Sequence, residues 1–144
     1  MRPKNPSNNI AGITFSTFDF FYAGHVKILE EAKSICDYPI LGLQLHPSID
    51  RKEKNKPVQS VIERYIEISS CKFVDEAVPY VTEKDLDEIL RSFKIDINII
   101  GEEHKDKSFI GKNYCEANRI QLYYNSRNHD FSSSNIRKKL SKEN

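Results

Sequence analysis

Apolar residues along the chain alternate between short runs and longer segments with helical spacing. Residues 10–15 form a short, mostly apolar and β-branched run, which predicts a buried strand. In the segment that follows, apolar residues recur at helical spacing while charged residues occupy the other face. The apolar positions of this segment are Ile28, Leu29, Ala32, Ile35 and Cys36. The pattern therefore predicts a strand, a tight turn and a helix.

The same alternation continues along the rest of the chain. Further short apolar runs predict strands over residues 38–45, 73–78, 95–100 and 120–124. Helical spacing and capping residues predict helices over residues 57–66, 82–93, 114–118 and 132–140. Strands that alternate with helices imply right-handed crossovers and a parallel sheet with both faces covered. We therefore predict an α/β, Rossmann-like fold of three layers with a five-stranded parallel sheet, and Asp75 and Glu76 favour an edge position for the third strand.

The length of 144 residues and the composition indicate one ordinary globular domain. Residues 1–9 are polar and contain two prolines, so we expect a loose lead-in followed by a single domain over residues 10–144. The 22 basic and 21 acidic residues leave a net charge of +1, which gives no electrostatic reason to expect nucleic-acid or membrane binding. No apolar run approaches membrane-spanning length, and the start of the chain lacks the apolar core of a signal peptide. We therefore expect a cytoplasmic protein.

The cysteines and histidines do not suggest a metal site in the protein. Cys36, Cys71 and Cys115 are odd in number, widely spaced and form no C-x-x-C pair, so buried thiols in a reducing compartment are expected. The remaining histidines outside the first turn have no metal-ligand spacing; they are His46, His104 and His129.

The turn between the first strand and the first helix is a candidate anion site. Gly24 and His25 lie at the opening of the helix, where free backbone N–H groups and the helix dipole favour a phosphate. Gly24 allows a ligand to approach the backbone, and the His25 side chain can donate a hydrogen bond to a phosphoryl oxygen. In a parallel sheet, the loops after the first, fourth and fifth strands would meet at this edge.

The start of the last predicted helix is a second candidate phosphate site. The polar loop over residues 46–56, which carries Lys52, Lys54 and Lys56, is predicted to be exposed. At the start of the last predicted helix, serine hydroxyls and free N–H groups can hold phosphate oxygens, and Arg127 can bind phosphate with two parallel hydrogen bonds. The serines of that helix start are Ser132, Ser133 and Ser134.

The first turn resembles the signature of the cytidylyltransferase-like nucleotidyltransferases, in which G-T-F-D-x-x-H-x-G-H joins the first strand to the first helix. The matching residues are Thr17, Phe18, Asp19, Gly24 and His25. Two positions differ from the motif, because Ser16 replaces a glycine and Tyr22 replaces the first histidine.

The later segments resemble the same family in the same order. Arg64 matches an arginine that contacts substrate phosphates in the family, although by itself it would be interpreted as a solvated helix arginine. A loop lysine has a similar role there, and we assign it to Lys54, with Lys52 and Lys56 as alternatives. Residues 127–134 resemble the motif R-T-x-G-I-S-[ST]-[ST], and residues 101–103 resemble the stretch beside the base and ribose.

The resemblance implies a chemistry and roles for individual residues. Such enzymes catalyse attack by a substrate phosphate on the α-phosphate of a nucleoside triphosphate, and pyrophosphate leaves. By resemblance the catalytic residues are His25, Arg127, Lys54 and Tyr22. The nucleotide would contact Thr17, Phe18, Gly24, His25, Gly101, Arg127, Ser132 and Ser133. The phosphate of the second substrate would contact Asp19 and Arg64.

The resemblance also implies the partners of the reaction. The leading hypothesis is transfer of CMP from CTP to a small phosphorylated alcohol such as glycerol 3-phosphate, with magnesium on the triphosphate and a homodimeric protein. One alternative is an adenylyltransferase of the same fold that uses ATP. Another is a nucleotide-binding module with weak catalysis, because a tyrosine at position 22 cannot become cationic near neutral pH as imidazole can. Loss of one donor to the transition state typically costs about 100- to 1,000-fold in rate.

Overall fold

The fold is a parallel sheet between two layers of helices. The computed structural model describes residues 10–19, 21, 23–49 and 56–125. Its strands are β1 (Ala11–Ser16), β2 (Tyr38–Gln44), β3 (Glu76–Tyr80), β4 (Ile97–Gly101) and β5 (Gln121–Asn125). They form a five-stranded sheet in the order β3-β2-β1-β4-β5, and every neighbouring pair is parallel. The predicted Rossmann-like sheet is confirmed.

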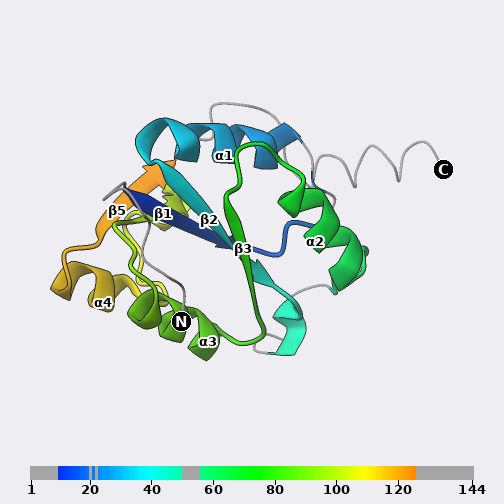
Figure 1. The fold of residues 1–144 in the computed structure, drawn as a ribbon. Helices are drawn as coiled ribbons and strands as arrows, with labels where there is room; N and C mark the ends of the chain where they lie inside the picture. Colours follow the sequence, from blue (N-terminus) through cyan, green and yellow to red (C-terminus); the bar gives the residue numbers. More distant parts are fainter. Residues whose placement is uncertain (1–9, 20, 22, 50–55, 126–144) are drawn as a thin grey trace.

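Helices cover both faces of the sheet. The α-helices of the described residues are α1 (Ala23–Ile35), α2 (Val61–Ser69), α3 (Glu83–Ser92) and α4 (Lys112–Ala117). Short 3₁₀ turns follow β2 and β4, at Pro47–Ile49 and Glu102–His104. The helices α1 and α2 lie on one side of the sheet, and α3 and α4 lie on the other (Figure 1). The helix predicted over residues 132–140 lies outside the described residues.

The third strand begins later than predicted. The prediction placed it over residues 73–78, whereas β3 runs over Glu76–Tyr80. Phe73 and Val74 instead pack into the core from a turn, in which the Val74 N–H donates to the Cys71 carbonyl. Within the described sheet, β3 pairs only with β2 and is an edge strand. An edge strand tolerates Pro79, which has no backbone N–H to donate to a further strand. The predicted edge position is confirmed.

The second helix also begins later than predicted. The prediction started it at Pro57, but α2 starts at Val61 with Ser60 as its N-cap. The Ser60 hydroxyl accepts from the Glu63 N–H, and the Glu63 carboxylate accepts from the Ser60 N–H. The two residues before this cap lie outside the helix, because the Ser60 backbone is extended with a ψ of 164°, and their N–H groups donate to the Asp19 carboxylate.

The cap predicted for α3 is confirmed. Thr82 is its N-cap, and the Thr82 hydroxyl accepts from the Asp85 N–H. Hydrogen bonds from the backbone of Thr82 and Val81 to the carboxylate lower the pKa of Asp85. The start of α3 is therefore fixed next to the carboxyl end of β3.

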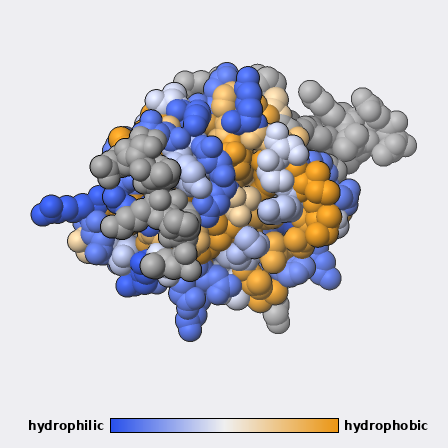
Figure 2. All heavy atoms as spheres, in the orientation of Figure 1, coloured by the Kyte–Doolittle hydropathy of each residue, from blue (hydrophilic) through white to orange (hydrophobic). Residues whose placement is uncertain are grey.

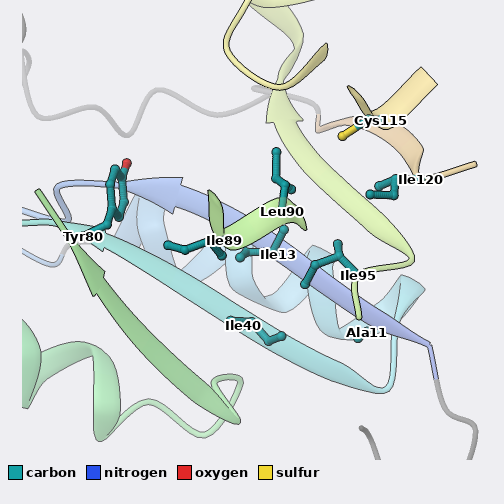
Figure 3. Packing of buried hydrophobic residues seen from close by; sticks show 9 residues of the cluster. All are labelled: Ala11, Ile13, Ile40, Tyr80, Ile89, Leu90, Ile95, Cys115 and Ile120. Atoms are coloured by element: carbon teal, nitrogen blue, oxygen red, sulfur yellow. The ribbon is translucent and has the colours of Figure 1, made fainter. Parts of the chain in front are cut away.

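The core consists of two layers on opposite faces of the sheet. The layer beneath α3 and α4 is shown in Figure 3, where Tyr80 lies towards the carboxyl ends of the strands. The layer beneath α1 and α2 includes Leu29, Leu41 and Ile68. No helix among the described residues combines the length and the apolar character that a membrane span requires.

Gly42 allows an aromatic ring to lie flat on the sheet. A side chain at position 42 would overlap the ring of Phe15, which comes from the neighbouring strand. The same ring meets Tyr80 edge to face, with centroids 5.6 Å apart. Phe15 and Tyr80 therefore form a fixed aromatic wall at the carboxyl edge of the sheet.

Candidate active site

A cavity of about 490 Å³ opens at the carboxyl edge of the sheet. The strand order reverses between β1 and β4, and this is where parallel α/β sheets bind ligands. Residues at the ends of β1, β4 and β5 line the cavity together with residues from α1 and α3. The structure thus brings together the strand ends that the sequence pattern placed at one edge. The predicted site residues on its wall are Thr17, Phe18, Asp19, His25 and Gly101.

The turn after β1 fixes an imidazole at the cavity. Phe18 has a φ of +52°, a left-handed conformation that is uncommon outside glycine, and its side chain is buried. The Phe18 ring contacts the His25 ring at 5.2 Å between centroids, and the Phe21 ring stacks on His25 at 5.7 Å. His25 is therefore held between two aromatic rings.

His25 is the third residue of α1, so its ring lies at the positive end of a 13-residue helix. It is 9% exposed and lines the cavity. Gly24 is buried directly before it, although it is not among the residues that line the cavity. The helix start and the imidazole together can stabilise negative charge on a bound phosphate.

Asp19 fastens this turn to the segment before α2. Its Oδ2 accepts from the Val58 N–H at 2.9 Å and its Oδ1 accepts from the Gln59 N–H at 3.0 Å. The carboxylate also lies close enough to the Arg64 guanidinium to favour the charged form of that arginine. Asp19 therefore has a structural role in the described residues, and its predicted contact with a substrate phosphate stays a prediction.

Arg64 is buried, so its interpretation as a solvated helix arginine is wrong. The side chain is 1% exposed, and burial lowers the pKa of its guanidinium while Asp19 opposes this shift. The guanidinium donates four hydrogen bonds of 2.7 to 3.3 Å to backbone carbonyls. The accepting residues are Thr17, Gln44, Leu45 and Gln59.

These contacts give Arg64 a positioning role that sequence reasoning did not find. It joins the β1 turn, the end of β2 and the approach to α2, but it is not among the residues that line the cavity. Its predicted contact with a substrate phosphate stays a prediction. The glutamate–arginine pair on a helix carried no signal of burial, because three of the four backbone carbonyls that Arg64 binds are 19 to 47 residues away in sequence.

Gly101 ends β4 at the cavity. A side chain at this position would overlap the Glu103 carboxylate, so the glycine lets that carboxylate fold back over the strand end. The remaining predicted site residues lie outside the described residues and stay predictions. They are Tyr22, Lys54, Arg127, Ser132 and Ser133.

Two buried asparagines on the cavity wall were not predicted. Asn98 in β4 and Asn125 at the end of β5 are each 2% exposed. The Asn98 Oδ1 and the Asn125 Nδ2 have no hydrogen-bond partner. The sequence did contain a signal for Asn98, because it is a single polar residue within the apolar run Ile97–Gly101.

Comparisons with known proteins agree with this geometry. The profile of the family described as Cytidylyltransferase-like matches residues 13–139. The chain belongs to this family. It is therefore a cytidylyltransferase-like nucleotidyltransferase, as the motif resemblance predicted.

Individual relatives show how far the similarity extends. A glycerol-3-phosphate cytidylyltransferase from Bacillus spizizenii is 34% identical over 73% of this chain and 81% of its own length. A probable ethanolamine-phosphate cytidylyltransferase from Encephalitozoon cuniculi is 31% identical over 74% of this chain, which spans 33% of that protein. The crystal structure of the lipopolysaccharide core biosynthesis protein from Thermoplasma volcanium matches with a TM-score of 0.69 at 22% identity, over 85% of this chain and 100% of that one. This last match supports the fold.

Replacement of Arg64 by methionine should destabilise the protein strongly. The Arg64→Met variant leaves buried carbonyls without a donor, so we expect the free energy of unfolding to fall by about 3 kcal/mol. Urea denaturation followed by circular dichroism measures the change. The matched control is Arg91→Met, because Arg91 is exposed and pairs with Asp87 on the surface of α3. This control should cost less than about 1 kcal/mol, and equal losses in the two variants would contradict the positioning role.

Proposed function

We propose that this protein transfers CMP from CTP to a small phosphorylated alcohol, such as glycerol 3-phosphate, and releases pyrophosphate. The observation that carries the proposal is the position of His25 at the start of α1, where the cavity meets the reversal in strand order. The similarity to the glycerol-3-phosphate cytidylyltransferase from Bacillus spizizenii supports both the nucleotide and the acceptor. The proposed reaction and the free thiols of Cys36 and Cys115 favour the cytoplasm as its location.

The proposed reaction is a single displacement at phosphorus. A phosphate oxygen of the acceptor attacks the α-phosphorus of the triphosphate and forms a new P–O bond. The bond from that phosphorus to the bridging oxygen breaks, and its electron pair leaves with pyrophosphate. His25 donates a ring N–H to a phosphoryl oxygen, and the first backbone N–H groups of α1 face the same charge. The protein accelerates the step by alignment and by neutralising charge.

The described residues offer no protein-based magnesium site. No three His, Cys, Asp or Glu side chains of residues 10–19, 21, 23–49 and 56–125 come together to hold a metal ion. Both Asp19 oxygens accept backbone hydrogen bonds instead. We propose that a magnesium ion enters together with the triphosphate.

Calorimetry and a pyrophosphate-release assay test the proposed function. CTP should bind more tightly than ATP, and glycerol 3-phosphate or a related phosphorylated alcohol should be required for release of pyrophosphate. The His25→Asn variant should lose about 100- to 1,000-fold in kcat. The matched control is His46→Asn, since His46 is exposed and is not among the described cavity residues. Absence of CTP binding would refute the proposal, and binding of ATP alone would favour an adenylyltransferase of the same fold.

A second candidate function, a nucleotide-binding module with weak turnover, follows from Tyr22. The Tyr22→His variant restores a group that can become cationic. If position 22 limits the rate, we expect kcat to rise by about 100-fold or more while the Kd for CTP stays within a few-fold. Single-turnover pyrophosphate release compares the variants. An unchanged rate would show that position 22 does not limit catalysis in this chain.

We further propose a homodimer formed through the outer face of α2. Ile62, Tyr65 and Ile66 are exposed on this helix at helical spacing, and Val58 is exposed beside them. Figure 2 shows the apolar patch over α2. The opposite side of α2 carries Arg64, which holds the β1 turn, so a second copy seated on this patch would support the site from behind.

Charge placed on the outer face of α2 should dissociate the dimer. A variant with both Ile62→Glu and Ile66→Glu introduces like charges that would have to be buried between two copies. Light scattering coupled to size exclusion should give twice the chain mass for the wild type and the chain mass for the variant. The control is Ile10→Glu, which changes an exposed isoleucine at the amino end of β1. A monomeric wild type would contradict the proposed interface.

A further inference from the structure

The cavity has an apolar compartment on the sheet face beneath α3 and α4. Its lining residues are Phe15, Tyr80, Leu86, Ile100, Phe109 and Ile110. Leu86, Phe15 and Tyr80 belong to, or pack against, the core layer of that face. A methyl group added at Gly111 would lie 3.8 Å from a Leu86 methyl, so the loop after β4 closes against α3. We call these six lining residues the apolar compartment.

Strand alternation separates the apolar compartment from the phosphate end of the cavity. Phe15 projects to one face of β1, whereas Thr14 and Ser16 project to the other face. Asn98 is paired with Ile13, which shares the face of Phe15, so Asn98 belongs to the side of the apolar compartment. His25 reaches the cavity from α1, which covers the opposite face. A ligand can therefore place its phosphates near His25 and an apolar part beneath α3.

Gln44, which is paired with Tyr80, is a second buried amide on this side of the described cavity wall, but the buried oxygen without a partner belongs to Asn98. Its Nδ2 lies 3.7 Å from the Cys115 Sγ, which is a weak hydrogen bond, and its Oδ1 has no partner. Its cross-strand neighbours are the apolar side chains of Ile13 and Leu122. The amide could also be turned by 180°, which exchanges Oδ1 and Nδ2. Because a thiol can donate as well as accept, the Cys115 contact would remain, and the Nδ2 group would then be the one without a partner.

This asparagine does not stabilise the free protein. A buried polar atom without a partner costs about 1 to 3 kcal/mol, and a leucine of similar size would fill the same position at no such cost. The amide stands at the wall of a cavity, so a bound ligand is the partner that would satisfy it. An alcohol hydroxyl is a suitable donor to Oδ1.

The direction of the reaction assigns this compartment to the acceptor. In a displacement at phosphorus, the attacking and leaving oxygens lie roughly in line on opposite sides of the phosphorus atom. If the leaving pyrophosphate is held at the start of α1, the acceptor approaches from the side away from that helix. The apolar compartment lies on that side, beneath α3.

We propose that the acceptor is a phosphorylated alcohol whose carbon skeleton has an apolar face, and that Asn98 selects it by accepting a hydrogen bond from one of its hydroxyl groups. This inference rests on the proposed nucleotidyl transfer. The carbon skeleton packs against the aromatic wall of Phe15 and Tyr80, and the hydroxyl reaches the Asn98 amide. An acyclic, fully hydroxylated acceptor such as glycerol 3-phosphate leaves part of this surface uncovered.

Two acceptors that differ by one hydroxyl group test the proposal. The probes are trans-2-hydroxycyclohexyl phosphate and cyclohexyl phosphate, with glycerol 3-phosphate as the acyclic reference, each assayed with CTP by pyrophosphate release. In the wild type, the hydroxyl should raise kcat/KM by about 5- to 150-fold, the range that corresponds to one hydrogen bond to a buried group. The hydroxylated ring should also be preferred over glycerol 3-phosphate.

Replacement of Asn98 should remove this preference. In the Asn98→Leu variant, the ratio of kcat/KM for the two ring phosphates should fall below about 3, while the KM for CTP stays unchanged. The free energy of unfolding should stay the same or rise, because the variant removes an unsatisfied amide. Asn98→Val provides a second apolar variant suited to a strand. The control is Tyr123→Phe, which removes a hydroxyl bonded to Glu31 outside the cavity lining and should leave the ratio unchanged.

Each contrary result has a distinct meaning. A hydroxyl preference that survives in both Asn98 variants, or a wild type that prefers glycerol 3-phosphate, overturns the inference while the proposed function stands. A raised KM for CTP in these variants also overturns it, because the compartment would then hold the nucleoside. If turnover is slow, calorimetric binding of the two ring phosphates in the presence of CTP decides the same question. Failure of CTP itself to bind refutes the proposed function instead.

Discussion

The geometry of the site depends on one buried guanidinium. Arg64 donates to carbonyls of three segments, namely the β1 turn, the end of β2 and the residues before α2. A planar cation with five fixed N–H groups can satisfy more carbonyls at once than a neutral amide, which has two. Asp19 joins the β1 turn to the residues before α2 by accepting from two backbone N–H groups. The two residues hold the β1 turn, in which Phe18 has a left-handed conformation. The Phe18 ring then fixes the position of the His25 ring by direct contact.

The cavity combines two environments because it crosses the edge of a sheet. Successive side chains of β1 point to opposite faces, so one short strand contributes both Ser16 and Phe15 to the same cavity. The start of α1 lies at one side of the cavity, and the apolar residues beneath α3 lie at the other. In the proposed reaction, the first side holds the phosphates and the second holds the acceptor. Two relatives in the family are named for different acceptors, glycerol 3-phosphate in one and ethanolamine phosphate in the other.

The fold could be predicted well from hydrophobic periodicity, and its errors lie at the starts of elements. Short apolar runs gave five parallel strands, and Thr82 gave the start of α3. The starts of β3 and α2 were wrong by three and four residues. At β3 a tertiary contact decides the boundary, because Phe73 packs into the core beneath α2. At α2 the capping box of Ser60 and Glu63 sets the first helical residue, and the N–H groups of the two residues before it donate to the Asp19 carboxylate.

The sequence by itself determined the alternation of strands and helices, the edge of the sheet at which the cavity opens, and the turn that carries His25. Each of these depends on interactions within a few residues along the chain, which leave a local pattern. Only the tertiary structure decided that Arg64 is a buried support and that Asn98 faces a cavity. The partners of Arg64 lie up to 47 residues away, and the neighbours of Asn98 follow from strand register. Burial of a polar group depends on which segments the fold brings beside it, and residue type and spacing do not encode that.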